Sequence, residues 1–247
     1  MFKKILIGII ANLIFSLLVL LICWGLYLIF RRRKVKKFFK IKDRRVTIYL
    51  SNIRVRSGGA IGVDGQERSY AGSTVSFGES YQASQFFSIF NYPIPSIQNK
   101  PGILKHLVVA DIKLQILLSP VDTADICNNS TIISLGSPGY NIVSEWIQNN
   151  FDSKASFIDD NGKIKIDGIP PISDTKKCFI ERIYDENNDR FIFYSAGLSE
   201  IGTEGATYYL ASHWNQLYQE YSDKSNFCIL LDINTNDYKD SRVISKT

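Results

Sequence analysis

Two short glycine-containing segments hold the residue types that could bind a ligand. The first, I-I-S-L-G-S-P-G-Y-N over residues 132–141, follows an apolar run that predicts a buried strand. Such a strand delivers its loop to the carboxyl edge of a sheet, where Gly136 and Gly139 allow close approach of the backbone and the next helix presents free N–H groups. We expect a phosphate or another anion to bind at Gly136, Ser137, Gly139 and Asn141. Asn141 either caps the helix or contacts a ribose or base.

The second segment, G-L-S-E-I-G-T-E-G-A over residues 197–206, repeats this arrangement. Gly202 permits close approach to a ligand, and Thr203 is expected to cap the following helix and to donate its hydroxyl hydrogen. The two loops converge if their strands are neighbours in a parallel part of the sheet. Gly202 and Thr203 therefore complete the predicted ligand site.

Three glutamates near predicted helix starts are the candidates for acid–base chemistry. Glu200 and Glu204 can accept hydrogen bonds from ribose hydroxyls or act as a general base, and Glu79 opens a helix predicted to reach residue 90. The competing interpretation is that they are first-turn acids favoured by the helix dipole. Because no nucleophile or paired acid follows from the spacing, binding is favoured over catalysis. A glycine-rich loop over residues 57–65, with Asp64 as its acid, is a third candidate segment.

An uncharged apolar stretch predicts one transmembrane helix over residues 5–30. Its 26 residues span about 39 Å, more than the roughly 30 Å of a bilayer core, and R-R-R-K follows directly. The stretch is too long for the apolar region of a cleaved signal peptide. Two basic residues precede it and ten follow within residues 31–45, so the positive-inside rule predicts an outside N-terminus and a cytosolic C-terminal domain, at the plasma or bacterial inner membrane.

The basic segment over residues 31–45 has two interpretations. The favoured one is a stop-transfer flank, which the positive-inside bias alone explains. The alternative is a contact with anionic lipid in which Phe38, Phe39 and Ile41 enter the membrane interface.

Charge and cysteine usage exclude several classes of protein. Residues 1–45 hold 12 Lys/Arg and one Asp, a net +11, whereas residues 46–247 hold 17 Lys/Arg and 23 Asp/Glu, a net −6. The folded part therefore lacks the basic surface of a nucleic-acid-binding domain. Four isolated cysteines and two histidines favour neither a disulfide framework nor a metal site.

Strand and helix patterns alternate along residues 46–235 and predict one α/β domain. Expected strands lie at 46–50, 131–135 and 227–231, with hairpins around 161–162 and 185–189. The apolar run over 107–118 fits one buried strand, two short strands or a helix. A helix follows residue 141, and another carries the stripe Ala206, Leu210, Trp214, Leu217 and Tyr221. The predicted fold is a Rossmann-like mixed sheet with helices and β-hairpins, and the polar tail over 236–247 is expected to fray.

Two of these segments resemble known motifs. S-G-G-A-I-G-V-D-G over residues 57–65 resembles the S-G-x-A-x-G-I-D loop of the DNA-processing Smf family, and I-G-T-E-G-A over residues 201–206 is similar to the G-T element of lonely-guy phosphoribohydrolases. Both belong to the SLOG group of Rossmann-like nucleotide-binding domains. Leu198, Ser199 and Glu200 replace the P-G-G of the phosphoribohydrolases and Ala206 replaces their glutamate, so the resemblance implies nucleotide binding more than glycosidic hydrolysis.

The resemblance also implies a biological setting. SLOG-like domains joined to transmembrane helices occur in bacterial anti-phage systems, where they sense a nucleotide signal and activate a membrane-disrupting effector. In this chain Gly136, Ser137, Asn141, Gly202 and Thr203 would then lie near the ligand.

These observations lead to three hypotheses. The first is a single-pass sensor that binds a nucleotide-derived signal and acts through homo-oligomerisation, because one transmembrane helix cannot form a pore alone. The second is a membrane-anchored nucleotide or nucleoside glycosidase or transferase that uses Glu79, Glu200 or Glu204 as acid or nucleophile. The third is a membrane scaffold that binds a protein partner. No cofactor is expected besides the nucleotide-type ligand.

Overall fold

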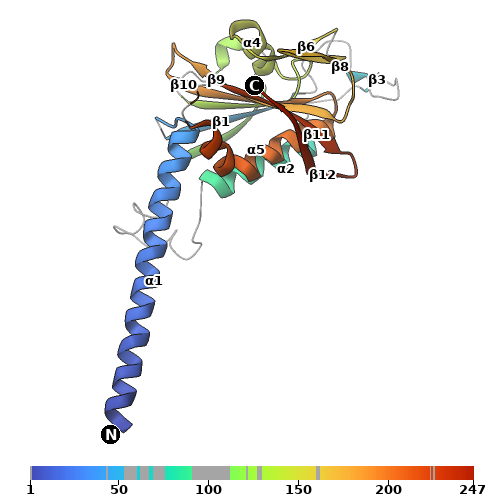
Figure 1. Ribbon diagram of the computed structural model, residues 1–247. Coiled ribbons are helices and arrows are strands. Elements are labelled where there is room, and N and C mark those ends of the chain that lie inside the picture. Colours follow the sequence, from blue (N-terminus) through green and yellow to red (C-terminus); the bar gives the residue numbers. More distant parts are fainter. Residues whose placement is uncertain are drawn as a thin grey trace.

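A long N-terminal helix projects from a mixed α/β domain (Figure 1). The computed structural model describes residues 2–42, 44–52, 60–61, 67–68, 76–90, 112–120, 122–126, 130–159, 162–222, 224 and 226–247. The projecting helix, α1 (Phe2–Phe38), has 37 residues. The domain that follows is built on a seven-stranded sheet with the order β12-β11-β9-β10-β5-β1-β4.

Four adjacent strands of this sheet run parallel. They are β10 (Arg190–Gly197), β5 (Thr131–Leu135), β1 (Arg45–Leu50) and β4 (Lys113–Leu118). The other three pair antiparallel: β9 (Lys177–Asp185), β11 (Phe227–Asn234) and β12 (Asp237–Lys246). The carboxyl ends of β10, β5, β1 and β4 therefore meet at one edge of the sheet.

Each face of the sheet is covered by a different layer (Figure 1). Helices α2 (Phe77–Phe90) and α5 (Glu200–Tyr221) lie side by side on one face, and α4 (Ile142–Asn150) lies on the other with a small sheet of β6 (Ala155–Ile158), β7 (Lys163–Ile166) and β8 (Ile169–Ile172). Two apolar clusters separate these layers from the sheet because successive strand residues point to opposite faces. A single-turn helix, η1 (Thr123–Asp125), and the short strands β2 (Ala60–Ile61) and β3 (Glu67–Arg68) complete the described elements.

The chain connections diverge between β1 and β5. From β1 the chain passes through α2 on one face of the sheet and reaches β4 on one side of β1. From β5 it passes through α4 and the small sheet on the opposite face and re-enters the large sheet at β9, on the other side of β5, before β10 fills the place beside β5. Connections that leave neighbouring parallel strands in opposite directions create a topological switch point, where a crevice opens outside the carboxyl ends of the strands.

The C-terminal end of α1 is part of the domain core. Phe38 and Phe39 are 1% and 0% exposed, and Val35 and Ile41 are buried with them. The Phe39 ring lies 4.9 Å from the ring of Phe90, measured between centroids. The alternative in which these aromatic residues enter a lipid interface is therefore wrong: the helix continues into the basic segment as far as Phe38, and the apolar side chains there belong to the domain core.

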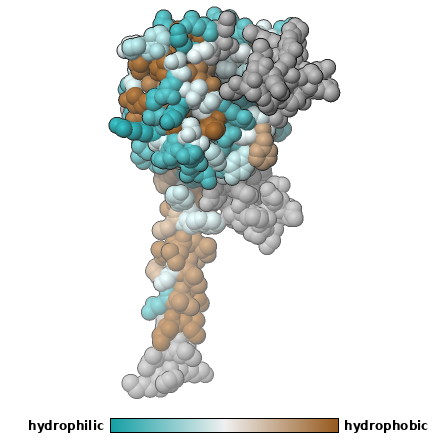
Figure 2. All heavy atoms as spheres, turned by 90° about the vertical axis from the view of Figure 1, so that its right-hand side faces the viewer, coloured by the Kyte–Doolittle hydropathy of each residue, from teal (hydrophilic) through white to brown (hydrophobic). Residues whose placement is uncertain are grey.

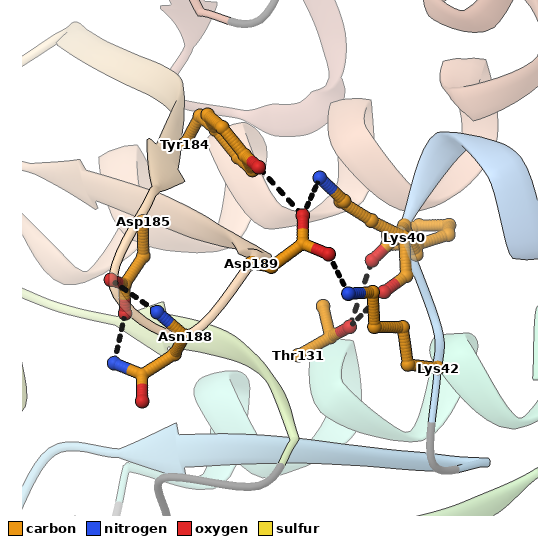
Figure 3. A network of polar contacts seen from close by, with 8 residues as sticks. Lys40, Lys42, Thr131, Tyr184, Asp185, Asn188 and Asp189 are labelled. Atoms are coloured by element: carbon orange, nitrogen blue, oxygen red, sulfur yellow. Dashed lines mark hydrogen bonds and ion pairs between the residues drawn. The ribbon is translucent and has the colours of Figure 1, made fainter.

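Polar contacts fix the turn that follows α1 (Figure 3). Lys40 and Lys42 both form ion pairs with Asp189 in the β9–β10 turn, and the Tyr184 hydroxyl donates to Asp189 Oδ1 at 2.6 Å. The Thr131 hydroxyl donates to the Phe39 carbonyl oxygen at 2.8 Å. The helix end is thus bound to both β5 and the β9–β10 turn.

The outer part of α1 has the length and composition to cross a membrane. Within Asn12–Phe38, the most apolar stretch of the helix is only 6% buried inside the protein. Figure 2 shows apolar side chains along the projecting helix. These side chains contrast with the mixed surface of the domain.

Most of the expected elements are confirmed. Strands β1, β5 and β11, helices α2 and α4, both hairpins and the buried stripe of α5 lie where the patterns predicted them. The frayed tail is wrong, because residues 237–246 form β12, whose backbone pairs with β11 while its polar side chains face solvent at the sheet edge. The run over 107–118 yields one half-exposed edge strand, β4, and residues 107–111 lie outside the described residues.

Replacing a core aromatic at the end of α1 should destabilise the whole domain. We expect Phe39→Ala to lower the free energy of unfolding by about 3–5 kcal/mol, because it leaves a cavity among packed rings. The measurement is urea unfolding of the full chain in detergent micelles. Phe15→Ala is the control: this residue lies on the same helix and is 67% exposed, so an equal loss in both variants would contradict the packing of Phe39.

Candidate functional site

A buried carboxyl group occupies the switch point between β1 and β5. Glu79, in the first turn of α2, is 5% exposed. The Ser51 N–H donates to Glu79 Oε2 and the Ser51 hydroxyl donates to Oε1, both at 2.8 Å. Ser51 follows the last residue of β1, so these bonds join the start of α2 to the carboxyl end of β1.

Gly136 supplies the space that this contact needs. It follows β5 with φ +97°, and a Cβ atom there would overlap the Ser51 hydroxyl and lie 2.9 Å from Glu79 Oε1. A side chain at this position is therefore excluded by both backbone conformation and space. Of the glycines predicted to contact a ligand, Gly136 is the one beside the Glu79 carboxyl.

Glu200 and Glu204, in the first two turns of α5, lie beside the start of α2. The Ser76 hydroxyl donates to Glu200 Oε1 and accepts from the Glu79 N–H at 3.2 Å. A Cβ atom at Gly78 would overlap the Glu204 side chain, so α2 and α5 approach closely here. The three candidate glutamates, far apart in sequence, thus meet at one edge of the sheet.

The electrostatics of this cluster shift the titration of its members. The pKa of Glu79 is raised from 4.5 to about 7, mainly by burial; the carboxylates of Glu200 and Glu204 contribute to the rise, and the two hydrogen bonds from Ser51 act against it. Burial and Glu200 also raise the pKa of Glu204. Near neutral pH, Glu79 is therefore an acid that exchanges its proton readily, a property common at functional sites.

A buried amide with no hydrogen-bond partner lies one turn beyond Glu79. Gln82 is 0% exposed, and within the part of the chain that the structure describes neither its Oε1 nor its Nε2 has a hydrogen-bond partner. An unsatisfied buried polar group costs about 1–3 kcal/mol. Since its neighbours on the buried face of α2 include Ala83 and Phe86, an apolar side chain would fit this layer better.

The amide of Asn141 is fully used within the protein. Its Oδ1 accepts from the Val143 N–H at 3.0 Å, and its Nδ2 donates to the Tyr49 and Leu135 carbonyl oxygens. Asn141 is thus the N-cap of α4, the first of its two predicted roles. Ser137 and Gly139 are half-buried in the preceding turn.

The second glycine segment packs α5 against β10. Ser199, not Thr203, caps α5, because the helix begins at Glu200 and the Ser199 hydroxyl accepts from the Gly202 N–H at 3.1 Å. Thr203 is buried and its hydroxyl oxygen accepts from the Gly197 N–H. A Cβ atom at Gly197 would lie 2.7 Å from the Gly202 carbonyl carbon, so the close approach here is between two backbones of the protein.

The predicted convergence of the two segments is observed. Strands β5 and β10 are parallel neighbours, and the Gly136 N–H donates to the Ser195 carbonyl oxygen at 3.0 Å. The starts of α2, α4 and α5 suit anion binding less well than expected. Ser76, Asn141 and Ser199 already accept hydrogen bonds from N–H groups there. Glutamates also place negative charge at the starts of α2 and α5. Among the described residues, no group of three or more His, Cys, Asp or Glu side chains can hold a metal ion.

Sequence reasoning missed Ser51, Ser76, Gly78 and Gln82. Position alone gives a signal for two of them: Ser51 directly follows a strand, and Gln82 is a polar residue three positions after Glu79 on the apolar side of a helix. The predicted loop over residues 57–65, including Asp64, lies outside the described residues apart from β2.

Fold and site define an α/β protein with a mixed sheet, an N-terminal apolar helix, and a cluster of carboxyl groups at the carboxyl edge of its parallel strands. Comparisons with models of known families, with curated proteins and with solved structures gave no match. The functional argument therefore depends on the site itself.

The titration of Glu79 should make stability depend on pH. A folded-state pKa of about 7, above the ordinary 4.5, means that the folded state binds the proton more tightly. The stabilisation is complete below about pH 4.5 and is lost as the pH rises through 7, with an upper bound of about 3 kcal/mol. We expect the free energy of unfolding to fall over this range in urea titrations of the full chain.

Glu79→Gln tests the origin of this dependence. Glutamine resembles the protonated acid, with its oxygen toward the Ser51 N–H and its amino group toward the Ser51 hydroxyl. The variant should lose the part of the slope due to Glu79 and keep the part due to Glu181, whose pKa burial also raises to about 7. An unchanged slope would refute the assignment to Glu79.

Proposed function

We propose that this protein is a single-pass membrane sensor whose cytosolic domain binds a nucleoside or nucleotide-derived ligand between the carboxyl ends of β1 and β5. The observation that carries the proposal is the buried cluster around Glu79 at the switch point, where open α/β sheets bind ligands. The four parallel strands and their diverging connections also support a Rossmann-like assignment for this half of the sheet.

The chemistry of the cluster favours the sugar and base of such a ligand over its phosphates. Ionised carboxylates only accept hydrogen bonds, so Glu200 and Glu204 suit ribose hydroxyls. A phosphate beside three glutamates would meet like charges that the capped helix starts do not offset. The ligand is therefore expected to enter with its nucleoside portion toward Glu79 and its phosphates toward solvent.

Two helices run from the proposed site to the base of α1. Helix α2 carries Glu79 in its first turn, and its last turns hold Phe86 and Phe90, which pack on Phe39. Arg31, near the start of the basic segment, donates to the Ser88 carbonyl oxygen of α2 at 3.3 Å and lies over the Trp214 ring of α5. A ligand that shifts α2 against α5 would therefore change the contacts at the end of α1 that joins the domain.

This arrangement supports a response through self-association. The basic residues after the apolar stretch favour a cytosolic domain, and a single apolar helix needs partners to disturb a bilayer. A ligand promotes assembly only if it binds the assembled state more tightly than the free one.

Loss of one carboxylate should weaken ligand binding without unfolding the domain. The full chain in micelles is screened by thermal shift against nucleosides, mononucleotides, cyclic nucleotides and ADP-ribose derivatives. A ligand at 100 times its Kd should add about 2.7 kcal/mol of stability. For Glu200→Gln, an exposed position, we expect affinity to fall roughly 10-fold to 100-fold, because a hydrogen bond to a charged group contributes about 1.5–3 kcal/mol.

Glu186→Gln is the matched control for this test. Glu186 is exposed in the β9–β10 turn, away from the cluster, and its substitution removes the same negative charge. Equal weakening in both variants would indicate a general charge effect, and a wild-type chain that binds none of these compounds would refute the proposal.

A second candidate function is cleavage or transfer of a nucleoside glycosidic bond. The specific observation is the Glu79 pKa of about 7 beside two further carboxylates, since glycoside cleavage uses one protonated acid and one ionised carboxylate. Glu79 would then protonate the leaving base, and Glu200 or Glu204 would stabilise the developing positive charge or attack the sugar.

Turnover distinguishes the two functions. If the protein is an enzyme, incubation with its ligand should release free base, detectable by chromatography, and Glu79→Gln should slow the release by about 100-fold to 10,000-fold. Ligand recovered intact from the wild-type protein would support the sensor and exclude the enzyme for that ligand.

A further inference from the structure

The Gln82 amide is buried without hydrogen bonds. Among the described residues, Gln82 is 0% exposed, and two of its polar atoms, Oε1 and Nε2, lack a partner, more than on any other buried side chain there. Asn141, by contrast, uses its amide for three hydrogen bonds within the protein. Because buried polar groups are rarely left without a hydrogen bond, the Gln82 amide is a candidate to contact a bound group.

The position of Gln82 links it to the carboxyl cluster. Residues three apart on a helix share a face, with Cβ atoms about 5–6 Å apart, so Gln82 lies one turn deeper than Glu79 between α2, α5 and the sheet. Hydroxyl groups of β10 and α5 line the same layer: Ser195 and Thr207 hydrogen-bond to each other at 3.2 Å, and Thr207 donates to the Thr203 carbonyl oxygen. The apolar layer between these helices and the sheet therefore contains a few buried polar groups besides Gln82.

We propose that Gln82 determines specificity by binding the edge of a nucleobase while the carboxyl groups bind the sugar. A primary amide presents a donor and an acceptor side by side, the pattern that pairs with the neighbouring donor and acceptor of a base edge, as in glutamine bidentate to adenine. This inference rests on the proposed function, since it names the part of the ligand that reaches Gln82.

The test uses two variants of the full chain in micelles. Gln82→Met keeps the size of the side chain and removes both polar atoms, and Gln82→Glu keeps the shape but replaces the amino donor. The probes are adenosine, guanosine, cytidine, uridine and free ribose, with Kd from calorimetry and Tm from thermal unfolding.

Gln82→Met should be more stable than the wild type and bind more weakly. We expect its Tm to rise by a few degrees, because an unsatisfied amide is removed, and its Kd for the preferred nucleoside to rise about 10-fold to 100-fold, the loss expected for one bidentate base contact. Ribose binding should not change, and Gln82→Glu should alter the order of preference among the four nucleosides. A rise in Tm also shows that the variant is folded.

Gln85→Met is the matched control, because Gln85 lies on the same helix but is only half-buried. Its nucleoside affinity should equal that of the wild type. Unchanged nucleoside Kd in Gln82→Met overturns the inference alone, and means that Gln82 faces an internal water or a simple packing defect. A wild-type chain that binds no nucleoside overturns both this inference and the proposed function.

Discussion

The packing of Phe38 and Phe39 is the interaction on which the rest of the molecule depends. Both residues end a helix whose outer part has the length of a bilayer, and both are buried between the sheet and α2. Because packed interiors resist gradual deformation, α1 cannot tilt or rotate without rearranging the rings around Phe39. The helix and the domain therefore behave as one mechanical unit, not as a domain on a flexible tether.

The same packing connects the carboxyl cluster, through α2, to the base of α1. The Ser76–Glu200 hydrogen bond and the packing of Glu204 against Gly78 join the starts of α2 and α5, whereas repulsion among the carboxylates opposes their approach. At the other end of α2, Phe86 and Phe90 pack on Phe39. A rigid helix with different contacts at its two ends is a physical basis for coupling two sites.

Local patterns were sufficient where one element determines its own structure. The apolar run over 131–135 and the stripe of α5 were predicted correctly because burial on one side of a strand or helix leaves a period in the sequence. The meeting of the two glycine segments was predicted only conditionally, since the pairing of β5 with β10 depends on contacts between distant residues.

The errors arose where tertiary structure decides. Phe38 and Phe39 stand among basic residues, so their burial in the domain left no local signal. The side chains of β12 are exposed or half-exposed, so this edge strand, which pairs through its backbone, left no apolar pattern. Ser199 and Thr203 are both good capping residues, and Ser199 is the cap because α5 begins at Glu200. The position of Gln82 on the apolar side of α2 was a signal in the sequence, but only the structure shows that, among the described residues, its amide is buried without a hydrogen bond.

The balance of charge at the cluster determines how a ligand can interact with it. A group with a pKa of about 7 changes its protonation readily, so Glu79 can donate a hydrogen bond as an acid or accept one as a carboxylate. A sugar hydroxyl satisfies either state, and hydrogen bonds donated to the neighbouring carboxylates weaken their repulsion. A phosphate would instead bring a further negative charge beside these carboxyl groups, and like charges repel. For the proposed ligand, recognition through sugar and base is therefore the mode that adds no repulsion at the α2–α5 contact.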